Sequence, residues 1–467
     1  MPDTDIKRGA TAEMDDIKIE LPDDVKNIIS QLEDAGYEAY AVGGCIRDSL
    51  LSRKPNDWDI TTSAVPTEIK KIFRHTVDTG IKHGTVTVLI YHEDRSKPCA
   101  YEVTTYRIDG EYEDSRHPVE VTFTSNLGED LKRRDFTINA MAYNDENGLA
   151  DPCGGIRDLK DGHIRCVGDP DERFSEDALR ILRAVRFSAQ LGFDIEEKTG
   201  GAAARLSGTL CNISAERIRD ELVKLVTSVH PEFLEKAYEL GITGVVLPEF
   251  DRCMQTPQNN PHHCYNVGEH ILHSMMNIEP DAILRLTMLF HDMGKPDTLV
   301  IDKEGITHNY GHATVSAELA AKVMKRLKFD NDTISKVTRL TGYHDIRIKQ
   351  DRNEVRHAVN KIGNDYFPML LKVKRADIMA KSEYCRIQNL ETLSEIEKIY
   401  EDIKDCGECV CLKDLDVTGG DLIAAGMKQG PEVGEALSEM LRDVLDHPEH
   451  NDRKYLIEAY RKRNENR

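Results

Sequence analysis

Residues 40–61, YAVGGCIRDSLLSRKPNDWDIT, decide the fold that this chain predicts. The pattern is typical of a short apolar strand, a Gly-Gly turn, a short helix, a loop and a second strand that carries Asp57 and Asp59. Side chains two residues apart in a strand point to the same face, so the two carboxylates are expected to project together. Carboxylates crowded on one face repel each other unless a divalent cation lies between them, and oxygen ligands suit Mg²⁺.

The turn at Gly43 and Gly44 decides between two interpretations of the aspartate pair, Asp57 and Asp59. An Asp-x-Asp pattern alone is typical of the ordinary polar face of an edge strand. The turn, however, opens the helix that carries Arg47, and the free N–H groups at the start of a helix are a site for phosphate. Together these features predict phosphoryl or nucleotidyl transfer.

Composition limits the class of protein. The chain has 467 residues, enough for about three domains, and its 39% hydrophobic and 31% charged residues are typical of a soluble globular protein. No apolar run approaches the roughly 18 residues that span a bilayer, and residues 1–20 are expected to be a flexible tail, neither signal peptide nor anchor. Eleven scattered cysteines favour reduced thiols in the cytoplasm.

The formal net charge of −21 argues against a protein that coats nucleic acid non-specifically. Any RNA contact therefore requires a concentrated basic patch. The segment 174–192, FSEDALRILRAVRFSAQLG, supplies the candidate. It predicts one helix with Ser175 as its N-cap, on which Asp177 and Arg180 share a face. The expected basic patch consists of Arg173, Arg180, Arg183 and Arg186.

Two further segments complete the predicted site. Residues 99–107, CAYEVTTYR, alternate as a strand and present Glu102 as a third carboxylate, although an exposed strand glutamate is a common alternative. Residues 133–140, RRDFTINA, carry Arg134, Asp135 and Asn139. Arginines in such a segment either clamp phosphates or form solvated surface. Between the two segments, the polar stretch 108–119 is expected to be a mobile loop.

These motifs resemble, in their order along the chain, the family of class II tRNA nucleotidyltransferases and bacterial poly(A) polymerases. The resemblance covers residues 22–230 densely and the remainder more loosely. It implies an α+β fold, with a small nucleotidyltransferase head built on a polymerase-β-like mixed sheet, followed by an all-helical neck, body and tail. The implied divisions are a tail at 1–20, a head at 21–167, a neck at 168–255, an HD-type helical domain at 256–385 and a tRNA-contacting helical tail at 386–467.

The same resemblance implies the roles of the site residues. Two metal ions, Mg²⁺ in this family, would be held by Asp57 and Asp59 with Glu102 as the third ligand, and would activate the 3′-hydroxyl of tRNA and steady the triphosphate of CTP or ATP. The nucleotide would be bound by Gly43, Gly44, Arg47, Arg134, Asp135, Asn139, Asp177, Arg180, Arg183 and Arg186. The expected partners are the 3′ end and elbow of tRNA, CTP and ATP, with no membrane.

The chemistry of Asp177 and Arg180 predicts which bases are selected. Cytosine and adenine each present an amino donor and a ring-nitrogen acceptor, so one accepting carboxylate and one donating guanidinium satisfy both. Uracil and guanine present the reverse order, which would leave two groups unpaired at about 1–3 kcal/mol each. The alternative is a surface salt bridge worth only about 0.2–0.5 kcal/mol.

Three subtypes of this family compete: full CCA addition, CC-only or A-only addition, and poly(A) synthesis. The segment 83–88, HGTVTV, and the long loop 107–118 resemble CCA-adding enzymes. The chain also lacks the basic segment that marks bacterial poly(A) polymerases. These features favour template-independent addition of CCA.

A histidine-rich block follows residue 257 and resembles an HD phosphohydrolase domain. Its minimal metal ligands would be His270, His291, Asp292 and Asp377, and His312 and His344 extend the set toward a second ion. Imidazole and carboxylate together suit a divalent transition metal. The alternatives are a vestigial platform for tRNA, a phosphohydrolase whose head only recruits RNA, and a non-catalytic RNA-binding protein.

Overall fold

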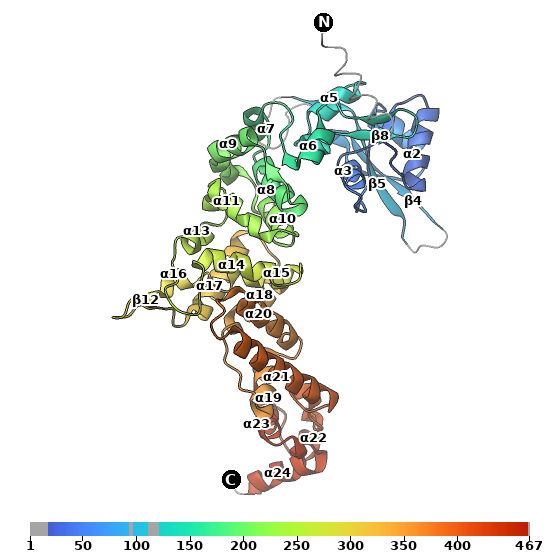
Figure 1. Ribbon diagram of the computed structural model, residues 1–467. Helices are drawn as coiled ribbons and strands as arrows, with labels where there is room; N and C mark the ends of the chain where they lie inside the picture. Colours follow the sequence, from blue (N-terminus) through green and yellow to red (C-terminus); the bar gives the residue numbers. More distant parts are fainter. Residues whose placement is uncertain (1–16, 93–96, 111–120, 466–467) are drawn as a thin grey trace. The chain divides into compact units, whose positions relative to one another are not determined.

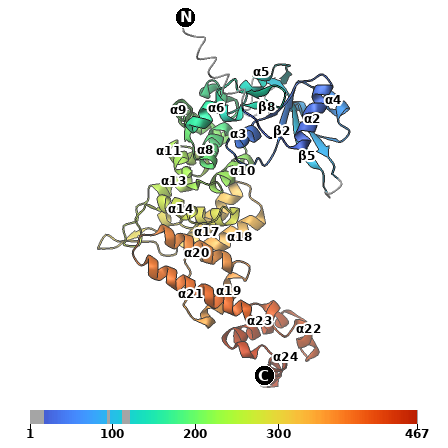
Figure 2. The same cartoon turned by 45° about the vertical axis from the view of Figure 1, so that its right-hand side comes forward.

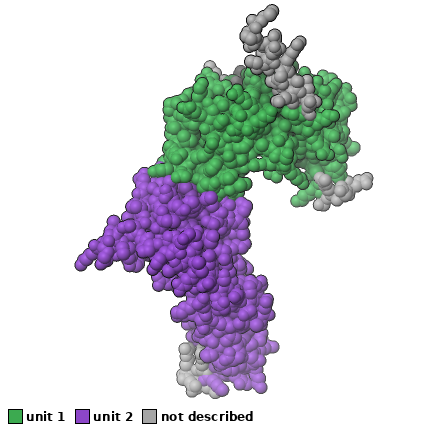
Figure 3. Space-filling view, viewed as in Figure 1, with its two compact units in different colours: residues 1–246 green, residues 247–467 purple. Residues whose placement is uncertain are grey.

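The computed structural model describes residues 17–92, 97–110 and 121–465. Most of the expected N-terminal tail and of the loop at 108–119 lies outside the described residues. The chain forms two compact units, residues 1–246 and 247–467 (Figure 3). The first holds the sheet and a set of helices, and the second is almost entirely helical (Figures 1 and 2).

A seven-stranded mixed sheet organises the first half of unit 1, with strand order β3-β4-β5-β2-β1-β8-β9. Only the β2–β5 pair is parallel, and the other neighbours are antiparallel. The strands are β1 (Ala39–Val42), β2 (Asp59–Thr62), β3 (Thr76–Gly80), β4 (Thr85–Ile90), β5 (Cys99–Thr105), β8 (Ala142–Asn144) and β9 (Gly148–Ala150). A separate hairpin joins β6 (Arg107–Asp109) and β7 (Val121–Phe123).

Helices pack on this sheet through apolar faces. On α2 (Asp23–Asp34), Val25, Ile28, Ile29 and Leu32 are buried, at the spacing of one helix face. This helix contacts β1 and β2, while α4 (Pro66–Ile72) contacts β4 and β5. The remaining helices of this half are α3 (Gly44–Leu50), α5 (Leu127–Lys132) and α6 (Gly155–Asp161).

The rest of unit 1 is helical, but the single helix expected over 174–192 is wrong. Helix α7 (Pro170–Glu176) ends before Asp177, whose backbone is extended (φ −140°, ψ 101°), and α8 begins at Leu179 and ends at Leu191. The N-cap of α7 is Asp169, whereas Ser175 lies inside α7 and donates to the Asp171 carbonyl oxygen. The following helices are α9 (Glu197–Leu206), α10 (Ala215–Val226), α11 (Leu234–Glu239) and α12 (Thr243–Val246).

Unit 2 packs its helices around a core that includes Leu340, Val359, Phe367 and Leu370. One two-stranded hairpin, β12 (Val300–Ile301) and β13 (Thr307–His308), projects from them (Figure 1). The longer helices are α13 (Pro248–Met254), α14 (Val267–Met276), α15 (Ala282–Phe290), α17 (His312–Arg326), α18 (Asn331–Tyr343), α19 (Arg352–Ile362), α20 (Phe367–Ala380), α21 (Arg386–Asp405), α22 (Gly419–Ala424), α23 (Pro431–Asp446) and α24 (Arg453–Glu465).

The architecture confirms the predicted α+β class, with a mixed-sheet head followed by helices. Among the described residues, no helix combines the length and the apolar character needed to cross a bilayer. The finer domain boundaries within each unit stay predictions.

Candidate functional sites

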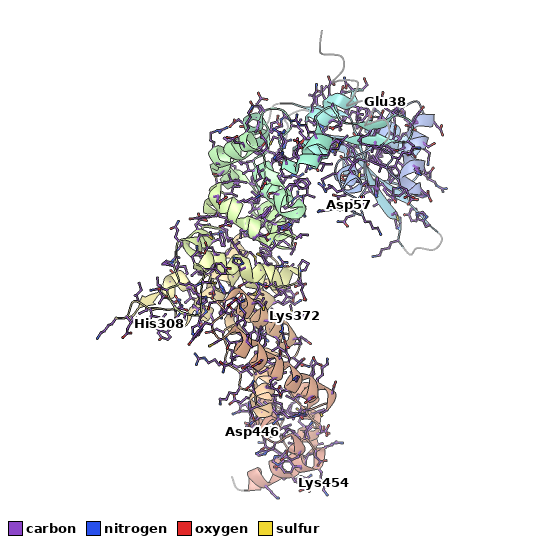
Figure 4. The ribbon with its side chains drawn as sticks, in the orientation of Figure 1. Glu38, Asp57, His308, Lys372, Asp446 and Lys454 are labelled. Carbon is purple, nitrogen blue, oxygen red and sulfur yellow. The ribbon has the colours of Figure 1, made fainter. Side chains whose placement is uncertain are left out.

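The predicted carboxylates meet at one end of the head sheet. Strand β2 begins at Asp59, so Asp57 lies two residues before the strand and not within it as expected (Figure 4). Ile60 pairs with Val103 in the parallel register, and one more step of that register places Asp59 beside Glu102. Both side chains line a cavity of about 190 Å³ that Arg134 also lines. The structure therefore brings carboxylates and a guanidinium together at this sheet end.

The pKa of Asp59 reflects its burial and the neighbouring carboxylates. Its pKa is raised, first because surrounding protein atoms remove water from the carboxylate, and then because Glu102 and Asp57 repel its charge, while Arg134 opposes the shift. The side chain still reaches solvent at the mouth of the cavity. Repulsion of this kind is what a bound divalent cation relieves.

The Gly-Gly turn lies directly beside an arginine of the same site. Gly43 has φ +84°, and a Cβ atom built on it would lie 3.1 Å from Nη1 of Arg134. Arg47 is buried and donates from Nη1 to Oδ1 of Asn139 at 2.7 Å. The positive φ favours glycine at this position, and a Cβ there would require the Arg134 guanidinium to move by a few tenths of an ångström.

Asp135 joins the head to helix α8. Its Oδ2 accepts a hydrogen bond from Nε of Arg183 at 2.9 Å, and its Oδ1 accepts from Nδ2 of Asn139 at 3.2 Å. Burial alone would raise the pKa of Asp135, but the Arg183 guanidinium and the hydrogen bonds hold it well below its usual value. Asp135 is therefore ionised and fixed, and it anchors Arg183 to the head.

Asp177 and Arg180 do not share a helix face as predicted, because the chain is extended between α7 and α8. Oδ2 of Asp177 accepts from Nη2 of Arg217 at 2.7 Å, and Oδ1 accepts from the Leu179 backbone N–H at 3.1 Å. Arg180 instead donates to Glu176 at 2.6 Å. Each of the two predicted base-selecting groups thus has its own partner.

All four arginines of the predicted basic patch have a carboxylate partner. Arg173 and Arg180 both contact Glu176 at 2.6 Å, and Arg186 contacts Glu221 at 2.7 Å, in each case nitrogen to carboxylate oxygen. Arg180 and Arg186 are buried. The four guanidinium groups thus share three carboxylates, those of Glu176, Asp135 and Glu221, so most of their positive charge is compensated inside unit 1.

In unit 2, the four predicted HD-type ligands come together from three helices. His270 lies on α14, His291 caps the end of α15 with Asp292 next to it, and Asp377 lies on α20. Nε2 of His270 is 3.0 Å from Oδ1 of Asp377, and Nε2 of His270 and of His291 are each 3.3 Å from Oδ2 of Asp292. All four side chains are buried.

Lys295 and Lys381 compensate the negative charges of Asp292 and Asp377. Burial lowers the pKa of His270, which favours the neutral imidazole that a metal needs. Burial would raise the pKa of Asp292, but Lys295, with Nζ 2.7 Å from Oδ2, keeps it well below its usual value. A site of this donor set fits a divalent transition ion.

Comparison with known proteins places this geometry in a family. Family models match in three segments: "Poly A polymerase head domain" at residues 39–165, "Probable RNA and SrmB- binding site of polymerase A" at 192–254 and "tRNA nucleotidyltransferase domain 2 putative" at 305–460. The CCA-adding enzyme of Levilactobacillus brevis is 34% identical over 436 residues, which cover 92% of this chain and 96% of that relative. The chain belongs to the CCA-adding enzyme family.

Other members of the CCA-adding enzyme family match over different lengths. The enzyme of Lactobacillus helveticus is 53% identical over 203 residues, so the match spans about half of that relative (49%) and 44% of this chain. A solved structure, the Bacillus stearothermophilus CCA-adding enzyme in complex with CTP, matches with a TM-score of 0.67 and 29% identity over 94% of this chain and 98% of that chain.

Sequence reasoning missed the partners that hold the predicted residues. Arg217 and Glu221 lie on α10, some 40 residues beyond Asp177, and no local pattern pairs them with α7 and α8. Lys295 and Lys381 follow Asp292 and Asp377 by three and four residues, and that helical spacing could have identified them.

Proposed function

We propose that this protein adds or repairs the 3′-terminal CCA of tRNA without a template, using CTP and ATP. The observation that carries the proposal is the meeting of Asp59, Glu102 and Arg134 at one cavity of a mixed-sheet head, next to the Gly43 turn. Its support is membership of the CCA-adding enzyme family over nearly the whole chain.

In the proposed reaction, the 3′-hydroxyl oxygen of tRNA attacks the α-phosphorus of a nucleoside triphosphate. The bond from that phosphorus to the bridging oxygen breaks, pyrophosphate leaves, and the hydroxyl proton is released. Arg47 and Arg134, with the backbone at Gly43 and Gly44, are proposed to bind the triphosphate oxygens. Guanidinium groups suit this role because they keep their charge and offer several donors.

The residues present fit Mg²⁺. Asp57, Asp59 and Glu102 offer only oxygen donors. The raised pKa of Asp59 reflects burial first and then repulsion from Glu102 and Asp57, which a cation would offset. When bound, the ions would supply charge that stabilises the entering and leaving oxygens. Asp57 and Asp59 are proposed as the principal ligands, with Glu102 as the third.

Base selection is proposed for Asp177 and Arg180, with one revision. The two side chains are held by Arg217 and Glu176 and do not form a helical pair. An incoming cytosine or adenine would donate its amino proton to Asp177 and accept from Arg180. Asp135, Asn139 and Arg183 are proposed to shape the nucleotide site, since they tie the head to α8. Arg186 is proposed to act through its pair with Glu221, which holds α8 against α10.

The test gives the purified chain a tRNA that ends before CCA, together with CTP, ATP or both. Addition of C, C and A in order is expected with both nucleotides. Addition that stops at CC, or a long A tail from ATP alone, would identify a sibling activity and refute the proposal. Asp59→Ala is expected to abolish every addition while tRNA binding persists.

Three further points belong to this proposal. His270, His291, Asp292 and Asp377 are proposed to hold one divalent transition metal. The helices after residue 386 are proposed to contact the tRNA elbow. The cytoplasm is proposed as the compartment, because all eleven cysteines lie in the described residues and each is a free thiol.

A further inference from the structure

Three metal-binding side chains meet beside one end of β4 and β5, although they lie far apart in the sequence. Asp24 lies in the first turn of α2, His92 follows β4 by two residues, and Cys99 is the first residue of β5. One ligand atom of each lies within 4.8 Å of the other two. A carboxylate, an imidazole and a thiol thus converge in unit 1, outside the sites described above.

The pairing of β4 with β5 explains why His92 and Cys99 come together. Ile90 pairs with Cys99 in the antiparallel register, so the chain that continues from Ile90 keeps His92 close to the start of β5. Helix α2 packs on the sheet and brings its first turn to the same place. Nε2 of His92 therefore lies 2.9 Å from Oδ2 of Asp24, 68 residues away in the chain.

Tyr101 holds the carboxylate of this cluster in position. Its hydroxyl donates a hydrogen bond to Oδ2 of Asp24 at 2.8 Å. Tyr101 and Cys99 lie two residues apart in β5 and so share a face of the strand. Carboxylates that bind a metal are oriented by outer hydrogen bonds of this kind, and Asp24 has one.

The chemistry of the three donors favours Zn²⁺ over Mg²⁺ and Ca²⁺. The two hard ions take oxygen ligands, whereas Zn²⁺ binds sulfur, imidazole nitrogen and carboxylate oxygen together. Bonds of about 2.0–2.3 Å place the ligand atoms of a tetrahedral Zn²⁺ ion about 3.3–3.6 Å apart. The separations in this cluster are close to that range, so small side-chain rotations would bring all three atoms to one ion.

We propose that Asp24, His92 and Cys99 form a reversible Zn²⁺ site that ties the start of α2 to β4 and β5. On binding, the thiol of Cys99 gives its proton to solvent and binds as the thiolate. The side chains of Asp24 and His92 are 16% and 32% exposed, so water reaches the ion and supplies the fourth ligand. The fold does not depend on the ion, because α2 packs on the sheet through its own buried apolar face.

The proposed Zn²⁺ site lies on the opposite face of β5 from the catalytic cavity. Side chains alternate along a strand, so Cys99 and Tyr101 point to one face and Glu102 to the other. Glu102 lines the cavity of the head together with Asp59. The ion is therefore expected to restrain α2 and the β4–β5 hairpin and to take no part in nucleotidyl transfer.

The first test titrates the full chain with Co²⁺, because a Co²⁺–thiolate bond absorbs in the near ultraviolet and Co²⁺ bound only to nitrogen and oxygen does not. No other candidate metal-binding group among the described residues includes a cysteine, so the histidines of unit 2 do not produce this band. We expect the band in the unmodified protein and in the control Cys153→Ser, a partly buried thiol like Cys99, but not in Cys99→Ser. A band that survives in Cys99→Ser, or is absent from the unmodified protein, overturns the site.

The same titration tests the role of Tyr101. Tyr101→Phe leaves the three ligands in place and removes the hydrogen bond to Asp24. We expect the absorption band to persist and the affinity for Co²⁺ to fall about 10- to 100-fold. An affinity equal to that of the unmodified protein overturns the positioning of Asp24 by Tyr101.

The second test measures the alkylation of each cysteine by iodoacetamide, with and without Zn²⁺, by mass spectrometry of peptides. At a free Zn²⁺ concentration ten times the dissociation constant, Cys99 is expected to react about tenfold more slowly, and Cys153 at an unchanged rate. An unchanged rate for Cys99 overturns the site. Protection of the tail thiols Cys406, Cys409 and Cys411 without protection of Cys99 overturns its assignment to the head.

CCA addition separates this inference from the proposed function. With Mg²⁺ as the added metal, Cys99→Ser is expected to extend tRNA at the rate of the unmodified protein, since Cys99 lies outside the catalytic cavity. Loss of the Co²⁺ band without loss of addition supports a Zn²⁺ site remote from catalysis. Loss of addition in a folded Cys99→Ser protein overturns the separation of the two sites.

Discussion

Replacing Asp177 by alanine is expected to weaken the choice of CTP over UTP rather than the binding of triphosphate. The amino group of cytosine loses its acceptor, and an unpaired group of this kind costs about 1–3 kcal/mol. At about 1.4 kcal/mol per factor of ten, kcat/KM for CTP falls about 5- to 150-fold. UTP loses little, because the carboxylate that opposed its carbonyl oxygen is gone.

The structure limits the damage that this substitution does to folding. Asp177 and Arg217 are 17% and 25% exposed as side chains, and a pair near the surface contributes about 0–1 kcal/mol. The bond from the Leu179 N–H at the start of α8 adds about 1 kcal/mol. Against a total stability of about 5–15 kcal/mol, the variant is expected to fold.

The assay measures single-nucleotide addition to a tRNA that ends before CCA, with CTP, ATP and UTP in separate reactions. Asp171→Ala is the matched control, since Asp171 is an exposed carboxylate on α7 paired with Arg205 at 2.6 Å. Arg217→Ala tests whether the effect arises only from releasing the Asp177 side chain. A CTP-to-UTP ratio in Asp177→Ala equal to that of the unmodified protein would refute the hydrogen-bonding argument.

Three other changes have expected outcomes. Glu221→Ala leaves the buried Arg186 guanidinium without its partner at 2.7 Å, so we expect a loss of about 3–5 kcal/mol in urea unfolding, and replacing both residues by apolar ones should recover most of it. The pKa of Asp59 is higher in the folded protein than in the unfolded chain. Without metal, the free energy of unfolding therefore falls as pH rises from the ordinary aspartate pKa to the raised one, and Asp59→Asn removes this loss. The melting temperature without Mg²⁺ should therefore be higher for Asp59→Asn than for the unmodified protein at pH 7, and no higher at a pH below that interval. Gly155→Ala places a Cβ 2.3 Å from a backbone carbonyl oxygen and should lower the melting temperature, whereas Gly208→Ala, with no atom within 4 Å, should not.

The sequence predicted those parts of the head that depend on interactions between residues close together in the chain. The alternation of apolar residues in the head strands and the Gly43 turn follow from side-chain periodicity and backbone conformation. The approach of Glu102 to Asp59 depends instead on the parallel pairing of β2 with β5. The four HD-type ligands were expected from the family resemblance, since they lie on separate helices that no local pattern brings together.

The break between α7 and α8 was not predictable in this way. The segment 174–192 has the apolar spacing of a continuous helix, and its interruption at Asp177 accompanies an ion pair with Arg217, 40 residues away in the chain. Likewise, the sequence around the arginines of α8 does not predict their partners. Asp135 and Glu221 lie on elements that come near α8 only in the tertiary fold. The net charge predicted that RNA contact requires a basic patch, but it did not predict the carboxylates that pair with the arginines of that patch.

The extended backbone at Asp177 has a mechanical consequence. The backbone of a residue inside a helix is held by hydrogen bonds on both sides, so only the side-chain torsions re-aim a carboxylate there. Asp177 lies between two helices, where a change in its own φ and ψ rotates α8 relative to α7 and moves the carboxylate with them. A pyrimidine and a purine place the same pair of groups at different distances from the sugar, and a hinge at this residue would suit the base-selecting role that we propose for Asp177.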